Sequence, residues 1–326
     1  MKTKTIKQVL RKRFDEFANS IEDKKVRNLV KKNSIITGGA IASMLLQEPV
    51  NDYDVYFTNH ETVIAVCKYY CDLFNKDNSK AHFLILDGFA TREEIGCSQE
   101  FYDTYVTPDR VKIRVTSRGM AVEDGFIFDE QEEIEDIPYG NAVVSNESEI
   151  EEPIEVGMIQ DTLKNEERKP SFRPVYISPN AITLSNNFQL IIRFFGDADE
   201  IHENYDFVHC TNYWKSDDGK LVCPGEALEC LLTKELRYKG SKYPLASIIR
   251  TRKFINRGFT VNAGQYLKMC LQLNDMDLRN LSVLEDQLIG VDALYFASML
   301  AKIPPEQKID NKIDSEYLIT MIDRFF

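Results

Sequence analysis

Apolar and polar residues follow two repeating patterns near the start of the chain. Residues 7–32 carry apolar side chains three or four positions apart on a charged background, which predicts an amphipathic helix or a broken pair of helices. Residues 34–37 form a short, largely β-branched run that leads directly into Gly38 and Gly39. A strand that ends in a glycine turn is therefore expected here.

The two patterns continue to alternate as far as residue 87. They predict a helix over 40–47 that ends before Pro49, a strand over 52–57, a helix over 60–74 and a strand over 81–86. Beyond this point the periodicity weakens, although residues 111–116 still predict a strand, and residues 123–169 are acidic. We interpret about 87–170 as an acidic insertion with a loosely ordered loop.

Regular patterns return after the insertion. They predict strands over 175–177, 181–184, 189–195 and 205–210, with a short helix near 197–203. The rest predicts helices at about 224–238, 245–256, 260–273, 281–302 and 314–325. The fold class expected is α/β (α+β), a small mixed sheet with a helical C-terminal part. We expect one domain over 1–211, which includes the insertion, and a helical domain over 212–326.

The composition is typical of a folded protein of the cytoplasm. The chain has 326 residues, of which 43% are hydrophobic, enough to bury a substantial core. Its seven cysteines are scattered and contain no CxxC pair, which argues against a disulfide framework and a structural zinc site. The basic N-terminus lacks the apolar core of a signal peptide, and no apolar run reaches the roughly 18 residues of a membrane span.

Charge is distributed unevenly along the chain. The net charge is −12, but residues 122–168 alone contain 16 acidic residues against two basic ones. Residues 220–268 show the opposite balance, with ten basic and three acidic residues. A local basic surface is therefore expected in the helical part, although the whole chain is acidic.

The strongest chemical signal is a pair of carboxylates after the glycine turn. Asp52 and Asp54 are two positions apart on a predicted strand, so their side chains lie on the same face. Two negative charges this close need a cation, and Mg²⁺ or Mn²⁺ suits carboxylates together with phosphate oxygens. Gly38 and Gly39 allow a close backbone approach to phosphates, next to the N-terminus of the following helix. The alternative is a structural turn followed by a solvated strand edge.

The spacing of these two features resembles a known superfamily. The run I-T-G-G-A ends in a turn whose Gly39 is thirteen positions before Asp52, and N-D-Y-D-V-Y-F follows. This resembles the nucleotidyltransferase superfamily related to DNA polymerase β. Its pattern is an apolar residue, G[GS], about nine to thirteen residues, and Dh[DE]h, where h is apolar. The resemblance implies a catalytic site that holds divalent metal and a nucleoside triphosphate.

The resemblance also implies a third carboxylate on a later strand. Asp206, in Y-D-F-V, has the expected form and is the candidate for a third catalytic metal ligand beside Asp52 and Asp54. It follows the pair by about 150 residues, which requires an insertion between core strands, and Asp103 and Asp129 are its rivals. In the family two metals bridge three acids, and nucleotidyl transfer proceeds in line with loss of pyrophosphate.

A second group of candidates lies in the helical part. Arg250, Lys253 and Arg257 are spaced by three and four residues, so they share one face of a predicted helix. With Gly38 and Gly39 they are the candidate nucleotide-binding residues, and the same face could contact RNA or tRNA. The alternative is an ordinary amphipathic helix with a solvated basic face.

The whole arrangement also looks like proteins of large tailed bacteriophages. The phage resemblance implies no activity of its own. The function implied by the nucleotidyltransferase resemblance is metal-dependent transfer of a nucleoside monophosphate to an RNA end, such as that of a tRNA, or to a protein hydroxyl. One alternative is a phage virion or assembly protein that uses an inactive nucleotidyltransferase fold for binding. Another is a toxin-like transferase that modifies host tRNA or protein. We expect no membrane partner, and a location in the host cytoplasm or the virion.

Overall fold

The computed structural model describes residues 2–77, 81–117 and 171–280, with short pieces between 283 and 320. The chain forms two compact units. Unit 1 consists of Met1–Leu10, Ile35–Val50 and Phe194–Phe326, and unit 2 of Arg11–Ser34 and Asn51–Arg193. Unit 1 contains residues from both sides of position 211, where the sequence predicts a domain boundary, and that boundary stays a prediction. Among the described residues, none of the helices is long and apolar enough to cross a membrane.

Unit 2 begins with a helix pair whose break is set by a capping residue. Helix α1 (Thr3–Ser20), whose first residues belong to unit 1, is followed by α2 (Lys24–Lys32). The carboxylate of Asp23 accepts hydrogen bonds from the backbone N–H groups of Lys25 and Val26, at 2.7 and 3.0 Å, and so starts α2. Of the two predicted possibilities for residues 7–32, the broken pair is therefore confirmed.

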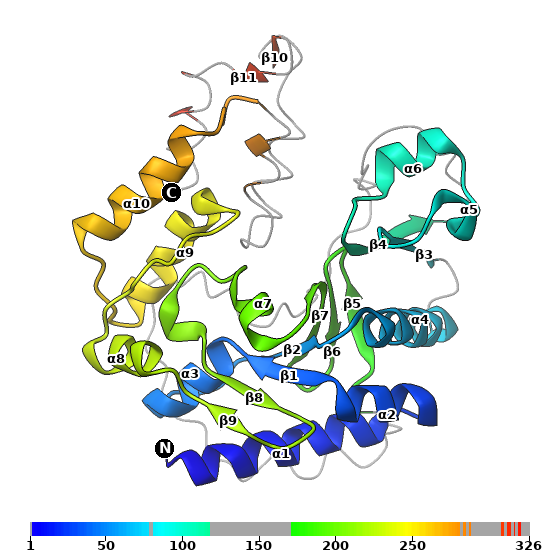
Figure 1. Cartoon of the computed structure of the whole chain (residues 1–326), viewed down its shortest axis with the longest axis horizontal. Coiled ribbons are helices and arrows are strands. Elements are labelled where there is room, and N and C mark those ends of the chain that lie inside the picture. The colour runs from blue at the N-terminus through cyan, green and yellow to red at the C-terminus, as the bar shows by residue number, and fades with distance from the viewer. Residues whose placement is uncertain are drawn as a thin grey trace, which may run out of the picture. The chain divides into compact units, whose positions relative to one another are not determined.

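In unit 2, strands β5 (Pro174–Ile177), β6 (Ala181–Leu184) and β7 (Phe188–Phe195) pair antiparallel in this order, and β2 (Tyr53–Phe57) is the next neighbour of β7. These strands are visible in Figure 1. In the loop between β6 and β7, Asn186 and Asn187 have φ values of 66° and 62°. Asn tolerates this left-handed conformation better than most residues, so the sequence favours a tight hairpin here.

Aromatic side chains from several segments fill the core of unit 2 around Phe188 on β7. The ring of Phe188 stacks on Phe17 of α1 at 5.2 Å and on Tyr53 of β2 at 5.1 Å, and it meets Phe172 edge-on at 5.1 Å. Tyr53 is therefore fixed on the core side of β2. Because side chains alternate along a strand, Asp54 projects to the opposite side of β2.

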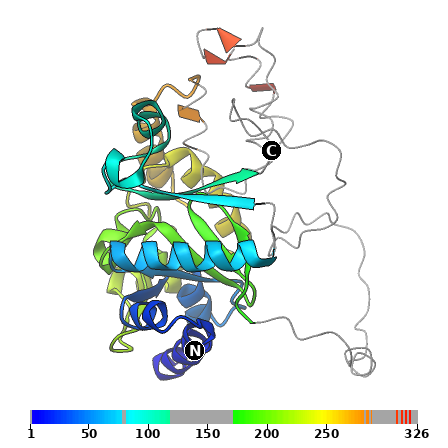
Figure 2. The same ribbon diagram turned by 90° about the vertical axis from the view of Figure 1, so that its right-hand side faces the viewer.

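The first part of the predicted insertion, residues 87–117, is folded, and its strand pairs with the strand predicted just before it. Strands β3 (Ala81–Asp87) and β4 (Val111–Ser117) pair antiparallel, and α5 (Arg92–Ile95) and α6 (Gln99–Tyr105) lie between them in the sequence. Figure 2 shows this hairpin, in cyan, beside the long helix α4 (His60–Asp77). The remainder of the predicted insertion, 118–170, lies outside the described residues, as does Asp129.

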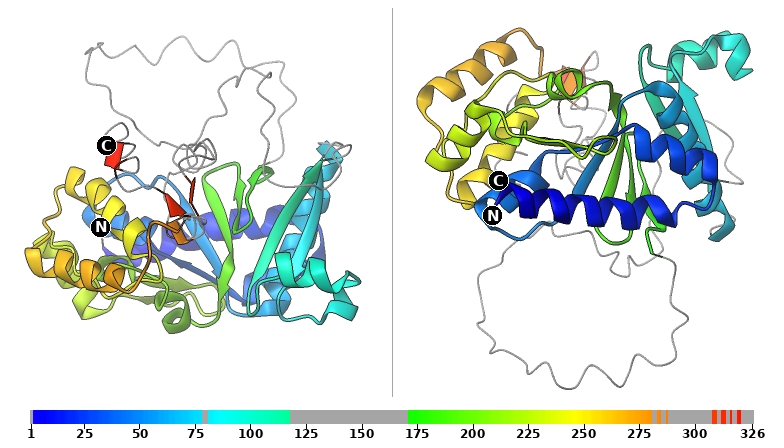
Figure 3. Two further views of the ribbon diagram at one scale, coloured as in Figure 1. Left: turned by 90° about the horizontal axis from the view of Figure 1, so that it is seen from above. Right: turned by 60° about the horizontal axis from the view of Figure 1, so that its bottom comes forward.

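Unit 1 combines three strands with a group of helices. Strand β1 (Ser34–Thr37), whose first residue belongs to unit 2, pairs antiparallel with β8 (Tyr213–Lys215), which pairs with β9 (Leu221–Val222). Its helices include α3 (Gly39–Leu46), α7 (Ala198–His202), the 3₁₀-helix η1 (Val208–Cys210), α8 (Gly225–Thr233), α9 (Pro244–Asn256) and α10 (Ala263–Asn274). Figure 3 shows α9 and α10, in yellow and orange, side by side. Two further short strands, β10 (Lys308–Ile309) and β11 (Lys312–Ile313), form a separate antiparallel pair.

A buried cluster joins α3 to the C-terminal helices of unit 1. It consists of Ala42, Phe207, Leu231, Leu236, Tyr238, Phe259 and Met269. Ala42 lies on α3, Leu231 on α8 and Met269 on α10, so apolar burial ties these three helices together. The helix that follows the glycine turn is therefore fixed to the helical part by packing. The expected α/β fold class is confirmed by these elements.

The prediction of a strand over 205–210 is wrong. Only Phe207 makes an isolated antiparallel bridge, to Tyr238, and the chain then turns into η1. The turn is stabilised because Thr211 Oγ1 donates to the carbonyl of Val208 at 2.8 Å and Asn212 Nδ2 donates to that of His209 at 3.0 Å. The alternation of apolar residues in this segment reflects burial of Phe207 and not a sheet.

Two predicted helix boundaries also differ. Helix α8 ends at Thr233 and not near 238, because Lys234 takes up a left-handed conformation with φ of 53°. Helix α10 starts at Ala263 and not at 260, because Asn262 Oδ1 accepts a hydrogen bond from the backbone N–H of Gln265 and caps the helix. The helices predicted over 281–302 and 314–325 lie for the most part outside the described residues.

Candidate functional site

The glycine turn forms the N-terminal end of α3. Gly38 is the N-cap of α3 with φ of 86° and ψ of −143°, a conformation that is almost restricted to glycine. Gly39 is the first residue of the helix, and a Cβ atom added to it would meet nothing within 4 Å. No side chain caps this end by a hydrogen bond. The first N–H groups of a helix lack intrahelical partners and carry positive partial charge, so this end suits an anion such as a phosphate.

Hydrogen bonds from the segment after α7 hold the glycine turn in place. The backbone N–H of Gly38 donates to the carbonyl of Cys210 at 3.2 Å. Thr37 Oγ1 donates to the carbonyl of Asn212 at 2.9 Å and lies 2.8 Å from His202 Nε2. Since the hydroxyl has one hydrogen, His202 must donate to it through Nε2. These hydrogen bonds, all within unit 1, fix the position of the last residue of β1 and of Gly38.

The predicted carboxylate pair belongs to unit 2. Asp52 is exposed and immediately precedes β2, whereas Asp54 lies on β2 and is half-buried. Two carboxylates form a donor set that Mg²⁺ accepts when phosphate oxygens complete its coordination. A metal at Asp52 and Asp54 would bind phosphate oxygens and neutralise charge that develops during transfer. Within the part of the chain that the structure describes, no group of three or more His, Cys, Asp or Glu side chains is arranged to hold a metal ion.

The structure brings together two residues for which the sequence predicts different roles. Asp206, the predicted third metal ligand, accepts a hydrogen bond from Arg250, a predicted phosphate contact, with 2.7 Å between Oδ2 and Nη1. Both residues belong to unit 1, as do Gly38 and Gly39. The side chain of Asp206 is only 12% exposed, whereas that of Arg250 is 32% exposed. The predicted third ligand is thus paired with a cation within unit 1.

The remaining candidate residues are Lys253, Arg257 and Asp103. Lys253 is exposed on α9, and Arg257 follows the end of that helix. Asp103, a rival for the third carboxylate, is on α6 in unit 2, where it accepts a hydrogen bond from Gln99 Nε2 at 2.8 Å. Their roles as phosphate contacts or metal ligands stay predictions.

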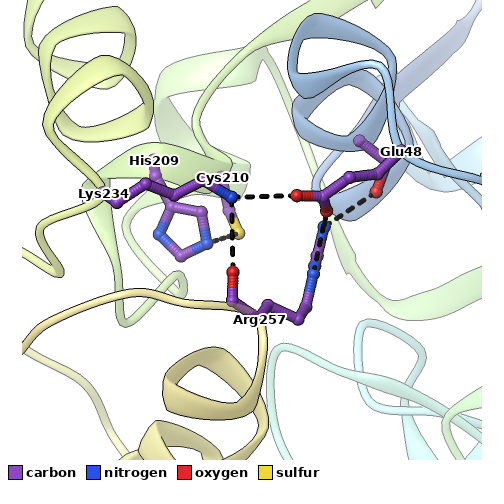
Figure 4. A network of polar contacts seen from close by, with 6 residues as sticks. Glu48, His209, Cys210, Lys234 and Arg257 are labelled. Atoms are coloured by element: carbon purple, nitrogen blue, oxygen red, sulfur yellow. Dashed lines mark hydrogen bonds and ion pairs between the residues drawn. The ribbon is translucent and has the colours of Figure 1, made fainter.

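Arg257 takes part in a polar network that the sequence gave no reason to expect. Lys234 Nζ and Arg257 Nε both contact the carboxylate of Glu48, at 2.9 and 3.2 Å, and Arg257 Nη2 donates to Ser43 Oγ at 3.1 Å. Figure 4 shows the two cations directed at Glu48. Burial opposes the ionisation of Glu48, but hydrogen bonds from Lys234 and Arg257 outweigh it, so the pKa of this carboxyl is below its usual value. The network ties the end of α3 to the ends of α8 and α9.

We expect Glu48→Gln to lower the free energy of unfolding by about 1–2 kcal/mol, because it leaves Lys234 and Arg257 close together without their shared anion. Urea denaturation at neutral pH measures the change. The matched control is Glu229→Gln, which removes an exposed ion pair with Arg237 (3.3 Å) and is expected to change stability much less than Glu48→Gln.

The pH dependence gives a second test of the Glu48 network. The lowered pKa of Glu48 means that its contribution to stability is present above the ordinary value of 4.5 and is lost as the pH falls below it. The difference between wild type and Glu48→Gln is therefore expected to shrink in acid. An equal loss of stability for Glu48→Gln and Glu229→Gln would contradict the structural role of this network.

His209 is buried in an aromatic cluster next to the Glu48 network. Its ring lies 4.5 Å from that of Phe254 and 4.9 Å from that of Phe259, and its Nε2 is 3.2 Å from Cys210 Sγ. Burial, together with the charges of Arg257 and Lys234, lowers the pKa of His209 to about 3. The imidazole is therefore neutral in the folded chain at physiological pH.

Folding stability is expected to decrease as the pH falls below about 6.5. The unfolded chain binds a proton on His209 near pH 6.5, whereas the folded chain binds it only near pH 3. His202 adds to the effect, because burial and the charge of Lys239 lower its pKa to about 4. Each histidine reduces stability by up to about 1.4 kcal/mol per pH unit within its window. Urea denaturation between pH 7 and 4.5 should show a shallower pH dependence for His209→Phe than for wild type, and equal slopes would contradict the prediction.

The fold and the site define a mixed α/β protein with a glycine turn at a helix N-terminus and a carboxylate pair on a strand. The chain belongs to the Gabija anti-defense 2 family, because the sequence profile of this family matches residues 8–234, which is more than half of the chain. A curated relative, "Gabija anti-defense 2" from Bacillus phage SPbetaL7, is 21% identical over 105 residues, which is 32% of this chain. The match spans only about a quarter (26%) of that relative's length.

Among solved structures, the chain is similar to the CCA-adding enzyme of Bacillus stearothermophilus in complex with CTP. The sequence identity is 11% and the TM-score 0.34, over 88% of this chain and 50% of that enzyme. A TM-score this low does not establish a shared fold. The family membership therefore rests on the sequence match.

Proposed function

We propose that the chain is a phage anti-defence protein that acts by nucleotidyl transfer. The family match and the phage relative support the anti-defence role, which the relative's name gives as directed against Gabija. The glycine turn supports the transfer chemistry: Gly38 adopts a glycine-specific conformation, and Gly39 leaves open space at the N-terminus of α3. This turn is the observation on which the proposal mainly rests.

The proposed reaction moves a nucleoside monophosphate to a hydroxyl group of an RNA end or of a protein. The acceptor hydroxyl releases its proton to water as its oxygen forms a bond to the α-phosphorus. The bond between this phosphorus and the oxygen that bridges it to the β-phosphorus breaks, and pyrophosphate leaves with that oxygen. Gly38 and Gly39 bind the triphosphate through backbone N–H groups, and Asp52 and Asp54 hold the Mg²⁺ or Mn²⁺ ion. Lys253 and Arg257 remain candidates for phosphate contacts on the helical side.

Transfer is tested directly with the purified chain. Each of the four nucleoside triphosphates, labelled on the α-phosphate, is incubated with Mg²⁺ or Mn²⁺ and with either total RNA or total protein from a host bacterium. The expected result is label on one of these two acceptor classes, which also identifies the acceptor. If the chain neither binds nor transfers any of the four triphosphates, the proposal is wrong.

The anti-defence role needs a separate test in cells. Bacteria that carry the Gabija defence are infected with a phage that this defence restricts, with and without expression of the chain. The expected result is that expression restores plaque formation. No change in plaque number would contradict the anti-defence role.

A second candidate function is anti-defence by binding alone, with the site inactive. The ion pair between Asp206 and Arg250 favours this alternative, because Arg250 binds the carboxylate that the nucleotidyltransferase pattern assigns to a metal ion. One variant distinguishes the two functions. If transfer is required, the Asp54→Asn variant should no longer protect the phage in the infection test. If this variant protects as well as wild type, binding is sufficient.

A further inference from the structure

The backbone around Asp206 is fixed by a short antiparallel contact within unit 1. The backbone N–H of Lys239 donates to the carbonyl of Asp206 at 3.0 Å, and that of Val208 donates to the carbonyl of Arg237 at 3.0 Å. Between these two bonds, the fully buried Phe207 is bridged to Tyr238. Asp206 therefore has a defined position, and its carboxylate is directed at Arg250 on α9.

The ion pair makes Asp206 a poor metal ligand. A metal would have to displace the guanidinium of Arg250 from a carboxylate that is 12% exposed, at 2.7 Å. Breaking a pair in which one member is largely buried is strongly unfavourable, because the other charge is left without its partner. A site with Asp52 and Asp54 does not need this third ligand, since one or two carboxylates and phosphate oxygens are sufficient for Mg²⁺.

The same ion pair is well suited to orient Arg250. A guanidinium carries five N–H donors in one plane, so it can bind a carboxylate and a phosphate at the same time. Arg250 is 32% exposed, so the guanidinium can be reached from solvent while it is paired with Asp206. Four residues after Asp206, the carbonyl of Cys210 accepts the hydrogen bond from the N–H of Gly38. The segment 206–210 thus contacts both Arg250 and Gly38, within unit 1.

We propose that Asp206 is a positioning residue that fixes the guanidinium of Arg250 for contact with the phosphates of the bound triphosphate, and that Asp206 is not a metal ligand. This inference rests on the proposed nucleotidyl transfer and changes the role that the sequence predicts for Asp206. Arg250 then recognises the phosphates within unit 1, and Asp206 takes no part in holding the metal.

The test uses the full chain and separates metal binding from triphosphate binding. Mn²⁺ binding is measured by electron paramagnetic resonance for wild type, Asp206→Asn and Asp54→Asn. We expect Asp206→Asn to leave the Mn²⁺ affinity within about twofold of wild type and Asp54→Asn to lose binding. Asparagine keeps one oxygen that can accept from Arg250, so this variant disturbs the fold as little as possible. A thermal unfolding scan of each variant confirms that it is folded, and Asp206→Glu replaces Asp206→Asn if the latter is not.

Triphosphate binding is measured by calorimetry with non-hydrolysable analogues of the four nucleoside triphosphates. Arg250→Gln is expected to weaken binding about ten- to a hundredfold, and Asp206→Asn by a smaller factor. The double variant should bind no more weakly than Arg250→Gln alone, because the two residues act as one unit. In the transfer reaction, Asp206→Asn should raise KM for the triphosphate with little change in kcat. Arg250→Lys keeps the charge but loses the planar donors, so its binding should be intermediate.

Two results would overturn the inference while the proposed function stands. The first is loss of Mn²⁺ binding in Asp206→Asn to the same extent as in Asp54→Asn, which would make Asp206 a metal ligand. The second is additive loss of triphosphate binding in the double variant, which would make the two residues independent. If wild type binds none of the triphosphate analogues, the proposed function itself fails, and the inference fails with it.

Discussion

Replacing Asp54 by Asn is expected to abolish nucleotidyl transfer and to leave the chain folded. Asp54 lies on β2, on the side opposite to Tyr53, whose ring is stacked on Phe188 in the core of unit 2. The substitution keeps the size of the side chain but removes the negative charge that a divalent metal requires. We expect the rate of transfer to fall by more than about a hundredfold, because even substitutions outside the ligand shell commonly reduce metal affinity or activity ten- to a hundredfold.

The matched control for Asp54→Asn is Asp72→Asn. Asp72 is exposed on α4 in the same unit, so this substitution changes the net charge by the same amount without touching β2. Transfer by the control should equal that of wild type. Initial rates with labelled triphosphate measure transfer, and thermal unfolding verifies that both variants are folded. Transfer by Asp54→Asn at the wild-type rate would remove Asp54 from the proposed metal site.

Replacing Gly39 by Ala is expected to block triphosphate binding without loss of stability. An added Cβ atom would meet nothing within 4 Å, and alanine is favourable at a helical position, so the free energy of unfolding should change by no more than about 1 kcal/mol. A phosphate that approaches the backbone closely would collide with this methyl group. We expect the Kd for a triphosphate to rise at least about tenfold, measured by calorimetry with a non-hydrolysable analogue.

Gly38→Ala provides the contrasting variant at the adjacent position. Gly38 has φ of 86° and ψ of −143°, so any other residue there is strained by about 1–3 kcal/mol. This variant should lose both stability and binding, whereas Gly39→Ala should lose binding alone. Unchanged affinity in Gly39→Ala would mean that the open space at the N-terminus of α3 does not receive the triphosphate.

The local pattern of the chain was sufficient to predict the elements around the glycine turn. The strand predicted over 34–37 is β1, the helix predicted over 40–47 is α3 (Gly39–Leu46), and the strand predicted over 52–57 is β2 (Tyr53–Phe57). These elements are short and bounded by glycine or proline, and their apolar positions follow one period each. Neighbouring residues alone therefore determine them.

The prediction for Asp206 shows where a local pattern is misleading. An apolar residue on either side of an aspartate is typical of a strand, but Phe207 is buried in a helical cluster and η1 follows it. Apolar alternation over so few residues indicates which side chains are buried, but it does not indicate whether the backbone forms the hydrogen bonds of a sheet. The metal role of Asp206 stays a prediction from the sequence, and its ion pair with Arg250 is what the structure adds.

The sequence by itself predicted the fold class, the glycine turn and the strand that carries Asp54, because the patterns that indicate them are local in the chain. Only the tertiary structure decided which charges are paired. Arg250 is 44 positions from Asp206, and Glu48 is 186 positions from Lys234 and 209 from Arg257. The Glu48 pairs form because packing of α3 against the C-terminal helices brings these side chains together, whereas the bridge between Phe207 and Tyr238 fixes the backbone next to Asp206. In both cases a partly buried charge is stabilised when it meets an opposite one.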